Sequence, residues 1–299
     1  MLSFRRLFAD NLPGSKPELW SNVPAVVWRR LSAWANTKMD PGWPQRPLIV
    51  TLEGGLMLEV IPGDVVGAPI ARFGVFEFAV TELLRAYLAP GDVFVDVGAN
   101  IGYYSVIAGG IVGEAGRVYA FEPSPRIRAR LVRNIALNQM ANVVEVRPEA
   151  ASIQAGTVRL VEPVGTGNDG LAYVDTSPGA RGIEVAAIRL DGLSELASRT
   201  PSLIKVDVEG GEPNVFQGAS GLLARADAPT IVFESFEIAR DAAILQAFGY
   251  EVFQPRLRSG AVRLVSDLSA PPYRRWEAPN FLAVKSERGR RFAAALTLQ

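Results

Sequence analysis

The sequence predicts an α/β protein with a mostly parallel, doubly wound sheet and helices on both faces, and two observations carry this prediction. Short apolar runs bounded by glycine, proline or polar residues recur along the chain and are typical of buried strands. Stretches with helical spacing of apolar residues separate most of these runs, and such alternation favours a parallel sheet. The composition, 48% hydrophobic and 21% charged over 299 residues, provides enough apolar side chains for a large core.

Residues 1–46 differ from the rest of the chain. They contain four of the five tryptophans and carry a net charge of +4, whereas the whole chain is neutral. Val27, Leu31 and Trp34 recur at helical spacing. We therefore expect a helical, Trp-rich, basic extension that packs on the main domain. The alternative is a surface that contacts an acceptor, a partner subunit or a lipid interface.

Residues 47–299 are predicted to form one domain, which begins with a hairpin and a helix over residues 47–90. Two apolar runs flank a Glu-Gly-Gly turn signal at residues 53–55, and an apolar helical face follows over residues 75–88. The core of the domain spans residues 91–285, and residues 286–299 are expected to be a C-terminal tail. Within the core, the predicted strands are 93–97, 117–121, 143–146, 158–161, 183–188, 203–208, 230–234, 250–253, 261–265 and 281–284. The predicted helices are 101–111, 125–140, one that begins near 212, and 237–248.

Histidine and cysteine are both absent, and this excludes several classes of enzyme. Ser-His-Asp and Cys-His catalysis and cysteine-ligated zinc are all excluded. Any proton chemistry must therefore use carboxylates, lysine, tyrosine or water. The neutral net charge gives no field to attract nucleic acid, so we expect no nucleic-acid partner. The longest uncharged run, residues 97–113, is too short and too rich in glycine for a membrane-spanning helix, so we expect a cytoplasmic location.

The turn after the first core strand is the first candidate site. Asp96 ends a buried strand, and Gly98 and Gly102 follow where a helix is expected to begin. Ligands of open α/β sheets bind at the carboxyl ends of strands, where a helix N-terminus offers free N–H groups. Glu122 ends the next strand, and a carboxylate there can accept both hydroxyl protons of a ribose. The two elements together indicate a cofactor that contains adenosine.

The glycine pattern distinguishes between adenosine cofactors. A dinucleotide site needs Gly-x-Gly-x-x-Gly, but counting from Gly98 places Asn100 and Tyr103 at the second and third glycine positions. No phosphate-binding P-loop is present either. The glycines of a dinucleotide site let the backbone approach the pyrophosphate closely. S-adenosylmethionine has no pyrophosphate and does not need these glycines, so it is the expected cofactor.

Four segments together resemble the FkbM family of S-adenosylmethionine-dependent methyltransferases, and the resemblance runs from about residue 48 to 285. The residues that carry it are Gly91-Asp-Val-Phe-Val-Asp-Val-Gly-Ala-Asn-Ile-Gly102, Phe121-Glu-Pro123, Leu203-Ile-Lys-Val-Asp-Val-Glu-Gly-Gly-Glu212 and Gly218-Ala219. The resemblance implies a class I Rossmann-like methyltransferase fold with seven strands, the last antiparallel. It also implies O-methylation of hydroxyl groups on sugars or polyketides.

The resemblance further assigns the cofactor-binding residues. Asp96, Gly98, Ala99, Asn100 and Gly102 would line the methionine end, and Glu122 would take the ribose. Glu149 and Ala150 would border the adenine, and Glu77 matches an acidic position that precedes the first core strand.

The segment from Lys205 to Glu212 is the second candidate site. Lys205 and Asp207 are two residues apart on a strand and point the same way, and a helix begins near Glu209 or Glu212. One interpretation is an ion-pair network that anchors the strand. The other makes Asp207 or Glu209 the base that removes the acceptor's proton, with Lys205 orienting that carboxylate.

The remaining predictions concern the acceptor, a metal and the overall activity. We expect Glu212 and Glu234 to bind the substrate. We expect no metal, although a divalent cation held by these oxygens is an alternative. The leading function is O-methylation of a small metabolite, glycan or polyketide. An NAD(P)-dependent oxidoreductase and a non-catalytic binding protein are the alternatives, and a homo-oligomer is left open.

Overall fold

The computed structural model describes residues 46–162, 172–175, 181–258, 261–269 and 279–297. The predicted helical extension therefore lies outside the described residues, apart from Arg46. Among the described residues, no helix is both long and apolar enough to cross a membrane.

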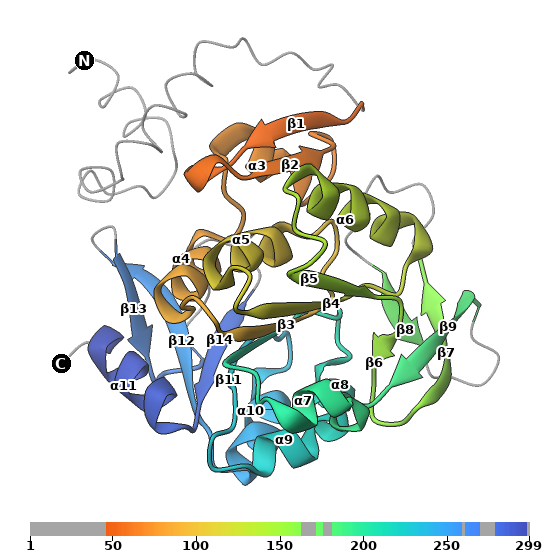
Figure 1. Ribbon diagram of the computed structural model, residues 1–299. Coiled ribbons are helices and arrows are strands. Elements are labelled where there is room, and N and C mark those ends of the chain that lie inside the picture. The colour runs from red at the N-terminus through yellow and green to blue at the C-terminus, as the bar shows by residue number, and fades with distance from the viewer. Residues whose placement is uncertain (1–45, 163–171, 176–180, 259–260, 270–278, 298–299) are drawn as a thin grey trace, which may run out of the picture.

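A large sheet forms the centre of the molecule (Figure 1). Five adjacent strands that reach one edge of the sheet are parallel to one another, and the strand beside them pairs antiparallel with both of its neighbours. The described sheet has eight strands in the order β13 (Ala261–Val265), β12 (Glu251–Arg258), β14 (Asn280–Val284), β11 (Thr230–Glu234), β10 (Leu203–Val206), β3 (Val93–Val97), β4 (Arg117–Phe121) and β5 (Val144–Arg147). Without β13, this is the predicted seven-stranded sheet with its last strand antiparallel. The eighth strand, β13, extends the edge as the antiparallel partner of β12.

Helices cover both faces of the sheet, as the alternating pattern predicts (Figure 1). One face packs against α4 (Phe78–Tyr87), α5 (Tyr103–Val112), α6 (Pro125–Leu137) and α11 (Glu287–Leu296), whereas α3 (Gly67–Phe73) packs against the N-terminal hairpin. The other packs against α7 (Ser194–Ser198), α8 (Glu212–Gly218), α9 (Ser220–Ala224) and α10 (Ile238–Ala247). Short 3-10 turns occur at η2 (Glu53–Gly55) and η3 (Leu190–Gly192).

A second, smaller sheet lies beyond β5 (Figure 1). Its strand order is β6 (Ala150–Ala151), β9 (Ile183–Ile188), β7 (Gly156–Val161) and β8 (Tyr173–Asp175). Ala150, Leu160 and Val185 form its own small core. Two of its strands were predicted, but they belong to this separate sheet and not to the central one.

The predicted N-terminal hairpin is confirmed as β1 (Leu48–Thr51) and β2 (Met57–Val60). Asn134 of α6 and Asn138, which directly follows that helix, attach β2 to the core. The Asn134 Oδ1 accepts the Glu59 N–H at 2.7 Å, and the Asn138 Oδ1 accepts the Met57 N–H at 2.8 Å. Each side-chain amide also donates to the carbonyl of the same β2 residue. The attachment holds the loop that follows β2 against the domain.

The prediction of a C-terminal tail over residues 286–299 is wrong for most of that segment. Ser286 caps the N-terminus of α11, and Ala293 is buried against the sheet. Arg288 pairs with Asp92 at 2.6 Å and lies over the ring of Tyr87. The helix forms because one apolar side packs on the core, whereas the sequence pattern drew attention only to its charged side.

Replacing Asn134 with alanine should lower the free energy of unfolding by about 2–3 kcal/mol. The side chain is fully buried, and its loss leaves the Glu59 N–H and the Ile101 carbonyl without this partner. Urea denaturation measures the change. Arg133→Ala on the same helix is the control, because its ion pair with Glu59 is exposed and should contribute less than about 1 kcal/mol. Equal losses in the two variants would contradict this attachment.

Candidate active site

The turn that follows β3 contains residues with left-handed backbone conformation, and it contacts the strands on either side of β3. Gly98 and Gly102 have φ values of 80° and 89°, a region open to glycine. The N–H groups of Gly98 and Ala99 both donate to the Phe121 carbonyl at the end of β4. A Cβ at Gly98 would lie 1.9 Å from the Asp207 carbonyl oxygen, so only glycine fits there. The two predicted segments therefore meet at one edge of the sheet.

Two carboxylates flank this turn. Asp96 is fully buried, and its Oδ2 accepts the Ser105 hydroxyl at 2.6 Å. Its Oδ1 has no hydrogen-bond partner within the part of the chain that the structure describes. Glu122 accepts the N–H groups of Asn100 and Ser124, both at 2.9 Å. Burial nevertheless raises the pKa of Glu122 to about 7, against the effect of these hydrogen bonds.

Lys205 lies between the acidic groups of the second segment. It is 2% exposed, and its Nζ donates to the Asp207 Oδ2 at 2.8 Å. The same ammonium group lies 4.7 Å from the ring centre of Tyr104. Burial alone would lower the pKa of Lys205. The attraction of the Asp207, Glu77 and Asp96 carboxylates is stronger than this effect of burial, so the pKa of Lys205 lies above its usual value. Lys205 is therefore cationic at every pH of interest.

Glu77 directly precedes α4 and hydrogen-bonds to two residues that are distant from it in the sequence. It has a φ of 42°. Its carboxylate accepts the Tyr104 hydroxyl and the Asn280 Nδ2, both at 2.7 Å. Burial raises the pKa of Glu77, and Lys205 opposes that rise. The structure thus places Glu77 in the cluster around Lys205.

Glu209 and Glu234 are the remaining members of the cluster around Lys205, and the pKa of each carboxyl group is raised. Burial, together with Asp207 and Glu77, raises the pKa of Glu234 to about 10, so Glu234 is protonated at neutral pH and hydrogen-bonds with Asp207. Glu209 has a φ of 51°. Burial and the neighbouring Asp207 and Glu212 raise its pKa to about 7. Within the described residues, the Glu209 carboxylate has no hydrogen-bond partner.

Glu212 is directed to the backbone of its own loop. As the first residue of α8, it accepts the N–H groups of Val208 and Gly210, both at 3.2 Å. It does not line the cavity described below, so the structure gives it a role in holding the Asp207–Glu209 loop. This position gives Glu212 no direct access to the cavity, and its expected contact with substrate stays a prediction.

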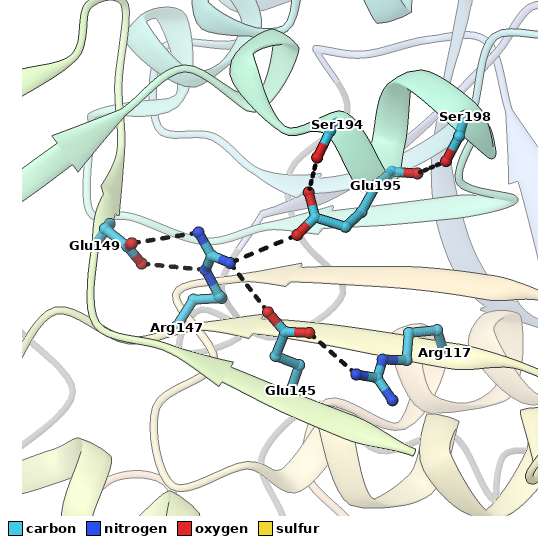
Figure 2. A network of polar contacts seen from close by, with 7 residues as sticks. All are labelled: Arg117, Glu145, Arg147, Glu149, Ser194, Glu195 and Ser198. Atoms are coloured by element: carbon cyan, nitrogen blue, oxygen red, sulfur yellow. Dashed lines mark hydrogen bonds and ion pairs between the residues drawn. The ribbon is translucent and has the colours of Figure 1, made fainter. Parts of the chain in front are cut away.

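Glu149 follows the C-terminal end of β5 and belongs to a network of charged side chains (Figure 2). Arg147 donates to both of its carboxylate oxygens at 3.3 Å, and also contacts Glu145 and Glu195. Glu145 in turn pairs with Arg117. The network fixes the orientation of Glu149 beside Ala150, and both residues line the cavity.

One cavity of about 250 Å³ joins these residues. Among the predicted residues, Glu77, Gly98, Ala99, Asn100, Glu122, Glu149, Ala150, Lys205, Asp207, Glu209 and Glu234 line it. Asp96 and Gly102 lie behind the turn and support it. Sequence reasoning missed Asn280 and the aromatic Phe236, which lines the rim and is 71% exposed. Tyr104 also lines the cavity and was not among the predicted site residues; its position directly after the glycine turn is the sequence signal that could have indicated a site role.

Comparison with known families matches residues 96–252 to the methyltransferase FkbM domain. The match covers more than half of the chain and contains both candidate segments. The chain belongs to the FkbM methyltransferase family. The resemblance seen in the sequence is therefore confirmed.

Relatives of this FkbM-family chain include two curated methyltransferases. A probable cobalt-precorrin-6B C(15)-methyltransferase (decarboxylating) of Sulfolobus acidocaldarius is 39% identical over 77 residues, which cover 26% of this chain and 40% of that protein. Methyltransferase sdnD of Sordaria araneosa is 30% identical over 162 residues, 44% of this chain and 62% of that protein. The chain thus matches less than two thirds of the length of either relative.

Solved structures show a more distant likeness. A methyltransferase FkbM from Methylobacillus flagellatus has 16% identity and a TM-score of 0.42, covering 68% of this chain and 50% of that one. An S-adenosylmethionine-dependent O-methyltransferase from Thermotoga maritima has 14% identity and a TM-score of 0.43, covering 80% and 77%. These likenesses are too distant to indicate a substrate.

The residues of the FkbM-family cavity fit S-adenosylmethionine. The turn at Gly98 packs against the Asp207 carbonyl with no space for a side chain, so the backbone of the turn lines the cavity directly, and the Glu122 carboxyl that lines the same cavity is a group that could accept from a ribose diol. The carboxylates around Lys205 that line the cavity suit a cationic group. Among the described residues, no group of three or more acidic side chains is arranged to hold a metal ion.

Gly98→Ala should abolish binding of S-adenosylhomocysteine and lower the melting temperature. Its Cβ would collide with the Asp207 carbonyl in addition to the unfavourable positive φ. Gly91→Ala is a matched control, since Gly91 has a φ of 87° but no other atom lies within 4 Å of the position that its Cβ would take. That variant should lose about 1–2 kcal/mol of stability and keep its affinity. Calorimetry and thermal unfolding measure both, and retained binding in Gly98→Ala would contradict the proposed contact between the two segments.

Proposed function

We propose that this protein transfers a methyl group from S-adenosylmethionine to a hydroxyl group of a small metabolite, glycan or polyketide. The observation that carries the proposal is the meeting of the Gly98 turn and the Asp207–Glu209 loop at one cavity. Membership of the FkbM methyltransferase family supports it.

The cofactor, when bound, would supply a methyl group attached to a positively charged sulfur. This sulfur is a good leaving group, because it keeps the electron pair of the sulfur–carbon bond. The protein must then orient the acceptor oxygen and remove its proton. Glu209 suits proton removal, because it has no hydrogen-bond partner in the described chain and a pKa of about 7. Glu209 would accept the proton of the acceptor hydroxyl as that oxygen takes the methyl group.

Asp207 and Lys205 are proposed to orient the acceptor. Lys205 fixes the Asp207 carboxylate by their 2.8 Å contact. The Glu234 carboxyl, whose pKa is raised to about 10, donates its hydrogen bond toward the same carboxylate, and a further lone pair of Asp207 could accept from an acceptor hydroxyl. Asp207 is the second candidate for the base, and Glu209 is favoured because it has no competing partner in the described part of the chain.

The rim of the cavity favours an uncharged acceptor. Carboxylates at Asp207 and Glu209 would repel phosphate or carboxylate groups on the substrate. Phe236, Phe76 and Val65 supply apolar surface at the same cavity. A neutral molecule with an apolar or ring face beside its hydroxyl fits both features.

Cofactor binding is the first test. Calorimetry should detect S-adenosylhomocysteine binding and no NAD⁺ binding, because the turn lacks the glycines that a pyrophosphate needs. NAD⁺ binding without S-adenosylhomocysteine binding would instead favour the oxidoreductase, and the proposal would fail.

Methyl transfer is the second test. Trideuteromethyl S-adenosylmethionine is incubated with the protein and a panel of neutral sugars and polyketides, and mass spectrometry detects the labelled ether. Glu209→Gln and Asp207→Asn should reduce product formation about 10²–10⁴-fold, whereas Glu251→Gln, at an exposed ion pair, should leave it unchanged. Undiminished product in both site variants would show that neither carboxylate is needed for the reaction.

The rate should depend on pH through Glu209. Its ionised form is the base, so kcat/KM should rise with pH up to about 7 and level off above it. The residual activity of Glu209→Gln should lack this inflection. A wild-type profile that is flat between about pH 5.5 and 8.5 would exclude Glu209 as the base.

A further inference from the structure

Phe236 is the most exposed large hydrophobic residue of the described chain. It is 71% exposed, compared with 56% for Ile49, and it lines the cavity. Val65, which is 50% exposed, lines the same cavity from the loop that follows β2. Single exposed apolar side chains are common on protein surfaces, but these two come from distant parts of the chain and meet at one concave site. The cavity therefore keeps apolar surface open to a ligand.

Neighbouring residues hold the backbone on both sides of Phe236. Ser235 is 2% exposed, and its N–H donates to the Pro279 carbonyl at 3.0 Å. The Ser235 hydroxyl donates to the Oδ2 of the buried Asp241 at 2.6 Å and accepts the Glu237 N–H at 3.2 Å. Because a fixed backbone presents the ring at the cavity, little conformational entropy would be lost when a ligand covers it.

The residues at the end of β11 face alternate sides, and this places Phe236 near the proposed acceptor site. Glu234 and Phe236 both line the cavity, whereas the hydroxyl of Ser235 between them donates to Asp241 of α10. Glu234 in turn hydrogen-bonds with Asp207. The aromatic ring therefore follows, two residues later, a carboxyl group that is joined to the carboxylate proposed to orient the acceptor.

The order of the strands separates Phe236 from the nucleoside part of the cavity. Along the sheet the parallel strands follow one another as β5, β4, β3, β10 and β11. Glu149 follows β5, and Glu122, which could accept from a ribose diol, follows β4. Phe236 follows β11 at the other end of this series, and Asp207 follows the neighbouring β10. A ligand that covers Phe236 is therefore the acceptor and not the cofactor nucleoside.

The side chains at this end of the cavity favour a particular kind of acceptor. Carboxylates such as Asp207 and Glu209 bind hydroxyl groups, and Phe236 binds an apolar face. A ring that carries a hydroxyl supplies both, because its face can lie on the phenyl ring while the hydroxyl reaches a carboxylate. An acyclic alcohol has no preformed face and would lose rotational freedom on binding.

We propose that Phe236 is a specificity-determining residue, which stacks against a neutral ring that carries the hydroxyl to be methylated. The inference rests on the proposed function, because it places the acceptor hydroxyl at Asp207 and Glu209. A pyranose and a carbocyclic ring of a polyketide share this chemistry. The protein should therefore prefer either ring to an acyclic alcohol.

Saturation-transfer NMR on the full-length protein, saturated with S-adenosylhomocysteine, measures acceptor binding without turnover. The probes are methyl β-D-glucopyranoside, resorcinol and the acyclic alcohol D-sorbitol. The wild type should bind at least one ring probe about ten-fold more tightly than D-sorbitol, as one aromatic contact would produce. Tighter binding of the pyranoside would indicate a glycan acceptor and tighter binding of resorcinol a polyketide, and either order supports the inference.

Variants at Phe236 test whether its ring is the cause of that preference. Phe236→Ala should weaken binding of the preferred ring probe about ten-fold and leave the affinities for D-sorbitol and S-adenosylhomocysteine unchanged. Phe236→Tyr, which keeps the flat ring, should bind as the wild type does, whereas Phe236→Leu should lose most of the preference. Ile49→Ala removes an exposed apolar side chain of β1 that does not line the cavity, and this control should change nothing.

Three results would overturn the inference while leaving the proposed function in place. The first is a wild type that binds neither ring probe more tightly than D-sorbitol. The second is Phe236→Ala or Phe236→Leu protein that keeps the full affinity for the preferred ring probe. The third is Phe236→Ala protein that loses the same factor of affinity for S-adenosylhomocysteine, which would indicate a role in the fold and not in acceptor choice. Failure of the wild type to bind S-adenosylhomocysteine would overturn the proposed function itself.

Discussion

The ion pair between Lys205 and Asp207, 2.8 Å long and formed by an ammonium group that is 2% exposed, fixes the rest of the site. A buried cation without partners would cost several kcal/mol, so the chain must bring negative groups to it. Glu77 and Asp96 supply them from the start of α4 and the end of β3, and Tyr104 supplies its ring. The requirement to neutralise one lysine therefore couples four separate segments of the chain.

The parallel core was predictable because its strands are buried on both faces. Runs such as residues 93–97 and 230–234 are apolar almost throughout, and nothing but an interior strand explains them. The position of the cofactor turn was also predictable, since Gly98 and Gly102 fall directly after such a strand. The meeting of this turn with Asp207 follows from the pairing of β3 with β10.

The parts that escaped prediction depend on contacts between distant residues. Asn280 reaches Glu77 across 203 positions, and no local pattern marks either residue as the partner of the other. The backbone contacts of Glu212 were also hard to foresee, because a carboxylate at a helix start suits its own backbone as well as a substrate, and its contact with substrate stays a prediction. The small sheet was not recognised as a separate unit, although two of its strands were predicted, and α11 was missed, because short, half-exposed elements carry weak periodicity.

Backbone strain links the fold to the chemistry. Four described non-glycine residues have positive φ, and three of them, Glu77, Asn100 and Glu209, line the cavity. Such a conformation costs about 1–2 kcal/mol for each residue, so it must be imposed by the surroundings. At Asn100 the cause is visible, because its N–H is held by Glu122 and its side chain accepts the Ile101 N–H. Glu77 and Glu209 thus stand in the cavity because the fold imposes their backbone conformation and places them there.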